Sequence, residues 1–360
     1  MKRVFVSDCE GPISQNDNAF EVTSHFVPDG DKLFTVISKY DDVLADVLKR
    51  PRYKAGDTLK LILPFLKAYG VTDEKMREFS AKSLVLIANV KNTLNYVRKI
   101  ADAFIVSTSY EHYIKALCNA LNFPYKNTYC TRLSIDKYAL AEKEKAKLKE
   151  MAKEIAQMPL IEIPSGAKSV KDFSEKDQKT IQRLDEIFWK EMASMDSGRI
   201  LNEVNPVGGG EKAEAVKDAV RKVGMALMNV MYIGDSITDI DAFRLVKDSG
   251  GLAVSFNGNQ YAIKNAEIAV LSENSIVTAV IADVFSRFGK QQTLSVIENW
   301  SRETLSKSQI NQTLLNSLFQ LYPRGLPKVK IITSENMEVL AKESNEFRKK
   351  VRGEAIGRLG

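Results

Sequence analysis

The sequence predicts an α/β protein built on a doubly wound parallel sheet that is interrupted by two helical insertions. Short runs of β-branched and aromatic residues, typical of buried strands, alternate with longer stretches in which apolar residues recur every three or four positions. Such alternation is typical of a parallel sheet with helices on both faces. In addition, several expected strands end at acidic or hydroxyl residues, at Asp8, Ser107 and Asp235.

The expected elements follow in a regular order along the chain. Strands are expected at 4–6, 103–106, 229–233, 252–256, 267–271 and 329–332. Helical periodicity is found within 13–99, 113–121, 139–157, from 174 onward, 211–223 and through most of 286–360. Because 13–99 and 134–200 lack strong strand signals, we expect these two stretches to be mainly helical insertions outside the sheet.

Composition excludes several classes of protein. The chain has 360 residues, of which 44% are hydrophobic and 27% charged, so it has enough apolar material for a globular core. The net charge of +6 is spread along the sequence, and we therefore expect no nucleic-acid partner. No window approaches the roughly 18 apolar residues needed to span a bilayer, so no direct membrane insertion is expected. Three cysteines without CxxC spacing favour a cytoplasmic location.

Polar residues at the expected strand ends form the candidate site. In an open parallel sheet, ligands bind beyond the carboxyl ends of the strands, where residues distant in sequence converge. Asp8 is a candidate nucleophile for an acyl-phosphate intermediate, and Glu10 lies two residues on, where it could supply general acid and base catalysis. Phosphoryl transfer also needs charge neutralisation by Mg²⁺, which Asp8 and Asp235 could share.

Four ordered motifs resemble those of the haloacid dehalogenase (HAD) superfamily. They are the stretch Val-Phe-Val-Ser-Asp8-Cys-Glu10-Gly-Pro, the strand ending at Ser107, Lys212, and Gly-Asp235-Ser-Ile-Thr-Asp239. The resemblance implies a Rossmann-like HAD fold and a Mg²⁺-dependent phosphatase with a helical cap, similar to phosphoserine phosphatase. A small phosphorylated metabolite is the implied substrate.

The resemblance also implies a role for each motif residue. Asp8 is implied as the nucleophile, and Glu10 as the acid and base that also gives a backbone carbonyl to the metal. Ser107 is implied to bind the phosphoryl group, while Lys212 neutralises the nucleophile and the phosphate. Asp235 and Asp239 are implied to hold Mg²⁺ directly or through water.

The same resemblance divides the chain into four parts. The HAD-like core is expected in residues 1–12, 90–132 and 205–285, with the helical cap in 13–89. A second helical insertion is expected in 133–204 and a C-terminal helical extension in 286–360. The first motif departs from the usual Asp-x-Asp-Gly-Thr pattern, because Glu10 is one methylene longer and Pro12 replaces the threonine.

Two alternatives stay open at the level of sequence. A phosphomutase would use the same aspartyl-phosphate but return the phosphoryl group to a sugar hydroxyl. A weakly active or inactive HAD-like scaffold would bind a protein partner through residues 133–204 or the C-terminal region. Some archaeal proteins of similar appearance belong to a HAD-like group labelled energy-converting hydrogenase subunit R. The basic stretch that contains Arg348 and Arg352 is expected to be a frayed, solvated terminus.

Overall fold

The computed structural model describes residues 3–357 and 359, and within them seven strands form one sheet in the order β3-β2-β1-β4-β5-β6-β7. All neighbouring pairs are parallel except β6 and β7, which pair antiparallel. The strands are β1 (Arg3–Ser7), β2 (Ala101–Tyr110), β3 (Thr128–Thr131), β4 (Val230–Gly234), β5 (Leu252–Phe256), β6 (Ile268–Leu271) and β7 (Lys328–Ile331). The predicted α/β class with a mostly parallel sheet is confirmed.

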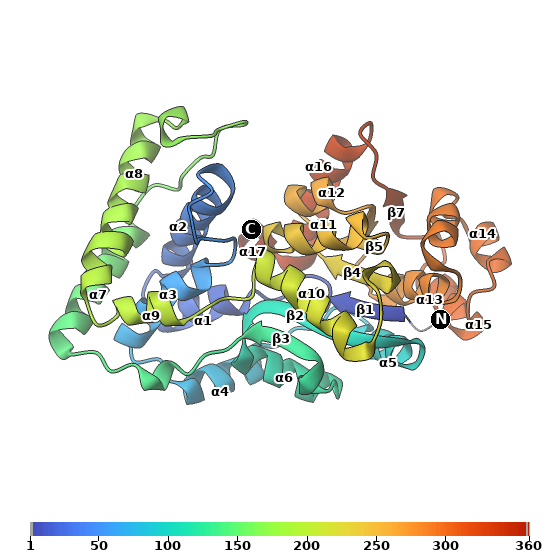
Figure 1. The fold of residues 1–360 in the computed structure, drawn as a ribbon, viewed down its shortest axis with the longest axis horizontal. Coiled ribbons are helices and arrows are strands. Elements are labelled where there is room, and N and C mark those ends of the chain that lie inside the picture. The colour runs from blue at the N-terminus through green and yellow to red at the C-terminus, as the bar shows by residue number, and fades with distance from the viewer. Residues whose placement is uncertain (1–2, 358, 360) are drawn as a thin grey trace.

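Helices cover both faces of the sheet, as Figure 1 shows. One face packs on α5 (Val90–Ile100), α6 (Glu111–Leu121) and α13 (Ile276–Glu298). The other face packs on α10 (Gly210–Val223), α11 (Ile240–Asp248) and α12 (Gln260–Asn265). Alternate residues of β1 point to opposite faces, so that Phe5 joins the first cluster while Val4 and Val6 join the second.

The two insertions lie together at one side of the sheet, on the left in Figure 1. The first contains α1 (Asn18–Phe26), α2 (Gly30–Asp42), α3 (Thr58–Ala68) and α4 (Asp73–Ser83), and the second contains α7 (Glu142–Ala156), α8 (Glu175–Glu186) and α9 (Gly198–Glu203). Their apolar side chains form one shared hydrophobic cluster, in which Leu33 and Leu61 of the first insertion pack with Leu148 and Phe188 of the second. The two segments therefore form one lobe beside the sheet.

The C-terminal region completes the sheet and returns to its carboxyl edge. It contains α14 (Arg302–Lys307), α15 (Gln312–Leu321), α16 (Met337–Arg352) and α17 (Glu354–Gly357), with β7 between α15 and α16. Helix α16 packs against α12 and β6 through Leu340 and Ala341. Figure 1 shows α17 between the insertion lobe and the sheet, where Leu359 is buried in the hydrophobic cluster of the insertions.

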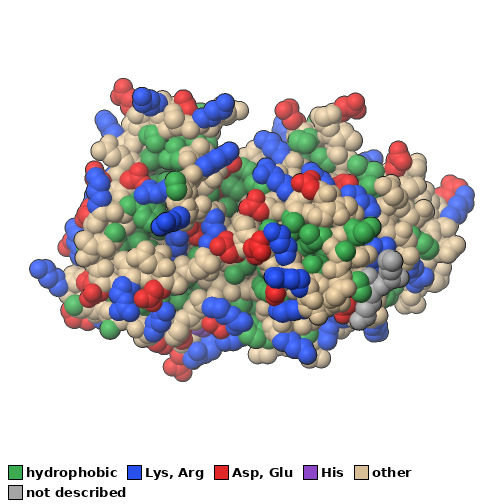
Figure 2. Space-filling view, viewed as in Figure 1, with side chains coloured by type: hydrophobic (Ala, Val, Ile, Leu, Met, Phe, Trp, Pro, Cys, Tyr) green, Lys and Arg blue, Asp and Glu red, His purple; other side chains and the backbone are tan. Residues whose placement is uncertain are grey.

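On the side of the molecule that Figure 2 shows, basic and acidic side chains are interspersed. This mixture agrees with a net charge of +6 distributed along the sequence. A search of the helices among the described residues finds none that is both long enough and apolar enough to cross a membrane.

Candidate active site

A small cavity of about 100 Å³ lies where the carboxyl ends of β1, β2 and β4 face the insertion lobe. Of the six candidate residues, Asp8, Glu10, Ser107 and Asp235 line this cavity. The other two are outside the lining: Lys212 contacts Asp8, and Asp239 contacts Lys212. The lobe contributes Ser38, Asp41 and Thr58, and the C-terminal region contributes Arg348, Arg352 and Leu359. The cavity is therefore enclosed by three parts of the chain that are far apart in sequence.

Asp8 stands directly after β1, where its backbone is held to the neighbouring strand. Its N–H donates to the carbonyl of Ile233 in β4 at 2.7 Å, and its Oδ1 accepts the N–H of Cys9 at 2.6 Å. Only 5% of the residue is exposed. Burial raises the pKa of Asp8 to about 8, and the ammonium of Lys212 acts in the opposite direction. Cys9 is fully buried in the core beneath the site.

Lys212 extends from the first turn of α10 and joins two carboxylates. Its Nζ donates to Oδ2 of Asp8 at 2.7 Å and to Oδ1 of Asp239 at 2.8 Å. The lysine has no exposed surface. A buried ammonium is stable only with such partners, so the lysine and the two carboxylates are mutually dependent. The pair Gly208-Gly209 permits the close approach of this turn, because a Cβ on Gly208 would lie 2.2 Å from the carbonyl oxygen of Ala55.

Asp239 shapes the loop after β4. Its Oδ1 also accepts the hydroxyl of Tyr232 at 2.6 Å, and its Oδ2 accepts the N–H groups of Asp235 and Ser236 at 2.9 and 3.0 Å. Burial opposes ionisation, but the contact with Lys212 and these hydrogen bonds outweigh it, so the pKa of Asp239 lies below its ordinary value. Asp239 is therefore a stable anion that positions Asp235 and Lys212.

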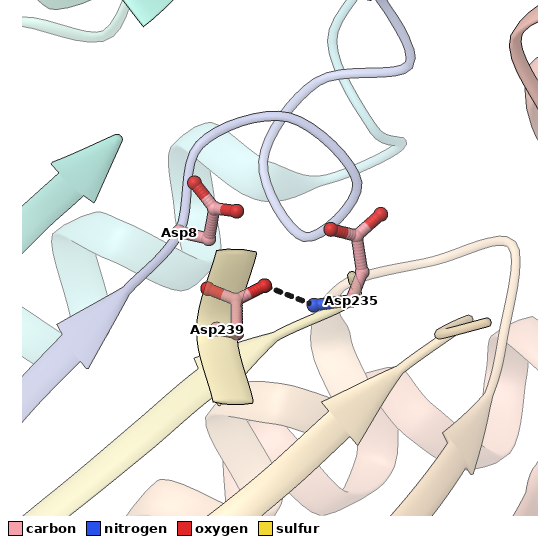
Figure 3. Close-up of side chains that lie close together, drawn as sticks. All are labelled: Asp8, Asp235 and Asp239. Carbon is pink, nitrogen blue, oxygen red and sulfur yellow. Dashed lines mark hydrogen bonds between the residues drawn. The ribbon is translucent and has the colours of Figure 1, made fainter. Parts of the chain in front are cut away.

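Asp235 faces Asp8 across the cavity, as Figure 3 shows. The residue is 1% exposed, and its neighbour across the loop is Gly11. Gly11 has φ of +102°, and a Cβ there would lie 2.2 Å from Oδ2 of Asp235. This position requires glycine for both its backbone conformation and the space that the carboxylate occupies.

Glu10 lies at the entrance to the first insertion. Its Oε1 accepts the N–H of Asn18, the first residue of α1, at 2.7 Å. Burial and the nearby carboxylate of Asp17 raise the pKa of Glu10 well above its ordinary value, against the effect of that hydrogen bond. A raised pKa favours the protonated form of Glu10, which is the form that can donate a proton to a leaving group.

Ser107 lies within β2, where the register with β3 shifts between Val106 and Tyr110. The residue is 1% exposed and lines the cavity, and its Oγ accepts the N–H of Ser109 at 3.2 Å. Strand β2 is longer than predicted, because it continues through Ser107 to Tyr110.

Three of these carboxylates are close enough to hold one cation. Asp8, Asp235 and Asp239 each offer an oxygen, and these oxygens lie within 4.8 Å of one another. An all-oxygen, mainly carboxylate donor set fits Mg²⁺. Each oxygen of Asp239 already accepts at least two hydrogen bonds, whereas each oxygen of Asp8 accepts one, so the direct ligands would be Asp8 and Asp235. Asp239 would then act through Asp235 and Lys212.

The expectation of a frayed basic terminus is wrong. Arg348 and Arg352 are 3% and 8% exposed and lie in the last turns of α16, where both donate to the carboxylate of Asp235. Helix α16 is anchored to the core, so these side chains belong to the cavity wall and not to a solvated tail.

The sequence held a signal for this placement. Leu340, Ser344, Arg348 and Arg352 recur at intervals of four, and therefore lie along one side of a helix. Leu340 and Ser344 are buried, which continues the inward face to the two arginines. The number of basic residues in this stretch does not reveal the buried face. Their spacing from Leu340 and Ser344 does.

Comparisons with known proteins agree with this geometry. The sequence profile of the haloacid dehalogenase-like hydrolases matches residues 72–283, more than half of the chain. This chain belongs to the haloacid dehalogenase-like hydrolase family. The matched stretch contains Ser107, Lys212, Asp235 and Asp239. Asp8 and Glu10 precede it, and the pairing of β1 with β4 brings them to the same place.

Individual relatives of this HAD-like hydrolase are more distant. A curated protein named phosphoserine phosphatase, from Archaeoglobus fulgidus, is 27% identical over 110 residues. This alignment spans 30% of the present chain and 30% of the relative. Among solved structures, the gene product AF1437 from Archaeoglobus fulgidus is similar with a TM-score of 0.80 at 24% identity. That similarity covers 100% of this chain and 99% of the other, and shows that the fold is shared throughout.

Proposed function

We propose that this chain is a Mg²⁺-dependent phosphomonoester hydrolase that acts on a small phosphorylated metabolite through an aspartyl-phosphate on Asp8. The observation that supports this best is the arrangement of Asp8 between Lys212 and Asp235, with Glu10 two residues on. A nucleophile, a cation to neutralise it, a proton donor and an acidic metal site are the components of such a reaction.

In the first half of the proposed reaction, a carboxylate oxygen of Asp8 attacks phosphorus. The bond from phosphorus to the substrate oxygen breaks, and Glu10 gives its proton to the leaving alkoxide. Ser107 and Lys212 hold the phosphoryl oxygens. Bound Mg²⁺, held by Asp8 and Asp235, would neutralise the negative charge of the phosphoryl group and favour the ionised form of Asp8.

In the second half, water attacks the phosphorus of the aspartyl-phosphate. The ionised Glu10 accepts a proton from this water, and the bond between phosphorus and Asp8 breaks to regenerate the free carboxylate. The insertion lobe covers the cavity and limits access by other waters. A cavity of about 100 Å³ favours a small substrate over a protein side chain on an intact surface.

The test is phosphate release from a panel of small phosphomonoesters with and without Mg²⁺. Asp8→Asn removes the nucleophilic charge, and Asp241→Asn removes an exposed carboxylate next to the same acidic motif as a matched control. We expect Mg²⁺-dependent turnover in the native chain and in the control, and none in Asp8→Asn. Equal turnover in all three proteins, or none in the native chain across the panel, would overturn the proposal.

Product analysis separates hydrolysis from a phosphomutase reaction. A hydrolase releases inorganic phosphate, whereas a mutase returns the phosphoryl group to another hydroxyl of the sugar. A scaffold would be silent in both assays and would retain a protein partner, for which residues 133–204 and the C-terminal region stay the predicted contacts. The cytoplasmic location predicted from the sequence belongs to this proposal, and all three cysteines are buried and free.

A further inference from the structure

Helix α16 brings two guanidinium groups onto a single carboxylate oxygen. Nη1 of Arg348 donates to Oδ2 of Asp235 and, at 3.3 Å, to the backbone oxygen of the same residue. Nη1 of Arg352 donates to the same Oδ2 at 3.0 Å. Both arginines and the aspartate are almost completely buried, so water screens these charges little.

The two arginines differ in what else they bind. Arg352 is committed to the loop that follows β1, because its Nε donates to the carbonyl of Gln15 at 2.9 Å and its Nη2 to the carbonyl of Asn16. Within the part of the chain that the structure describes, Arg348 donates only to the carboxylate and the backbone oxygen of Asp235. Its Nε is buried without a hydrogen-bond partner among the described residues, and its side chain lines the cavity. Arg348 is thus the arginine that can move away from Asp235 without releasing the loop that follows β1.

The backbone that carries Arg348 is fixed. Ser344, one turn earlier, donates from its Oγ to the carbonyl of Gly258 at 2.6 Å, and Leu340 and Ala341 pack with Ile263 and Leu271. The contact with Asp235 therefore depends on the side chain of Arg348 and not on docking of a loose tail. Loss of the contact with Asp235 would therefore move the guanidinium group of Arg348 without moving the backbone of α16.

A guanidinium group and a divalent cation in contact with the same carboxylate repel each other and share its one negative charge, so each weakens the binding of the other. We propose that Arg348 competes with the divalent cation for Asp235, so that cation binding requires the guanidinium group to leave. This inference rests on the proposed cation site between Asp8 and Asp235. Arg348 is a residue that sets cation affinity, and its role is distinct from those of the motif residues.

The test measures cation binding itself, by calorimetric titration of the full chain with Mg²⁺ and, separately, Mn²⁺. Arg348→Gln removes the charge and retains a hydrogen-bonding side chain of similar length. Lys350→Gln is the matched control, since Lys350 lies on the same helix, is 69% exposed and pairs with Glu273 at the surface. We expect Arg348→Gln to bind the cation about tenfold more tightly than the native chain, with Lys350→Gln unchanged.

Equal or weaker cation binding by Arg348→Gln overturns the competition while leaving the proposed hydrolase intact if the native chain turns over with Mg²⁺. Absence of cation binding in every protein overturns both proposals. A second measurement uses the native chain: NMR of the arginine side-chain Nε–H groups with and without Mg²⁺, with the signal of Arg348 assigned by its absence in Arg348→Gln. Competition predicts that this signal shifts when Mg²⁺ is added, and an unchanged signal contradicts it.

Discussion

The Nζ of Lys212 lies 2.7 Å from Oδ2 of Asp8, and the lysine has no solvent-exposed surface. The two residues are 204 positions apart and come from a helix turn and a strand end. Since the pKa of Asp8 is raised by burial, this ammonium is the group in the described structure that most favours the ionised, nucleophilic form. The same ion pair therefore stabilises the buried site and favours the ionised form of Asp8.

Removing that ammonium should abolish activity and destabilise the fold. In Lys212→Met, the carboxylates of Asp8 and Asp239 lose a shared buried partner, and we expect the free energy of unfolding to fall by about 3–5 kcal/mol. Urea denaturation and phosphate release measure the two effects. Lys217→Met is the control on the same helix, because Lys217 forms only an exposed pair with Glu214 and should change stability by about 1 kcal/mol or less. Similar behaviour of both variants would contradict this assignment.

Gly11→Ala should damage the site through Asp235. The new methyl group would lie 2.2 Å from Oδ2 of Asp235, in addition to the strain of a non-glycine residue at φ of +102°. Gly70→Ala controls for the strain alone, since Gly70 has φ of +75° and nothing within 4 Å of the added Cβ. We expect a larger loss of thermal stability in Gly11→Ala than in Gly70→Ala, together with loss of turnover. An equal loss in both variants would show that the contact with Asp235 is relieved at little cost.

Arg352→Met tests the brace between α16 and the loop after β1. The substitution leaves the carbonyls of Gln15 and Asn16 without their donor, and each such buried group costs about 1–3 kcal/mol. Denaturant titration should therefore show a clear decrease in the free energy of unfolding. Lys350→Met, on the same helix but exposed, should change it by about 1 kcal/mol or less. A stable Arg352→Met protein would mean that the loop finds other donors.

The raised pKa of Asp41 predicts that the free energy of unfolding depends on pH. It is buried in the insertion lobe, where it accepts the hydroxyl of Tyr53 at 2.6 Å and the N–H of Gly56 at 2.9 Å. Burial raises the pKa of Asp41 to about 7, against the effect of these hydrogen bonds. Because the folded state binds this proton more tightly than the unfolded state does, the contribution to stability is full below about pH 4 and is lost as the pH rises through 7.

Asp41→Asn removes that titration. The free energy of unfolding should decrease less between pH 5 and pH 8 in the variant than in the native chain, as measured by urea denaturation at both values. Any hydrogen bond that asparagine fails to replace affects both pH values equally, so the comparison isolates the proton. A decrease of the same size in both proteins would assign the pH dependence to other groups.

The sheet and the motif residues could be predicted because each is encoded locally. The run Val4-Phe5-Val6 is apolar and β-branched, and Asp8 follows it directly, so strand, strand end and acidic residue can be read within a few positions. The rule that ligands bind at the carboxyl edge then brings Asp235 beside Asp8. Strand β3 (Thr128–Thr131) was missed, because four residues with two threonines give too short a pattern to distinguish from a loop.

The remaining features depend on tertiary packing. Nothing local to Leu148 or Leu33 indicates that the two insertions share one hydrophobic cluster, since each insertion has its own helical periodicity. Arg348 and Arg352 resemble any basic helix end until the buried positions that precede them at intervals of four are considered. Burial of charge is decided by partners far along the chain, and a single sequence does not specify those partners.

The contact between Arg348 and Asp235 also sets an order of events during protein synthesis. Arg348 is the 113th residue that the ribosome adds after Asp235. At roughly 5–20 residues per second, Asp235 is made roughly 6–23 s before its arginine partners exist. Strands β1, β2 and β4 have all been synthesised by then. The negative charge of Asp235, however, is not yet paired with Arg348 and Arg352. A nascent chain therefore passes through an interval in which the carboxylate of Asp235 lacks both of its arginine partners.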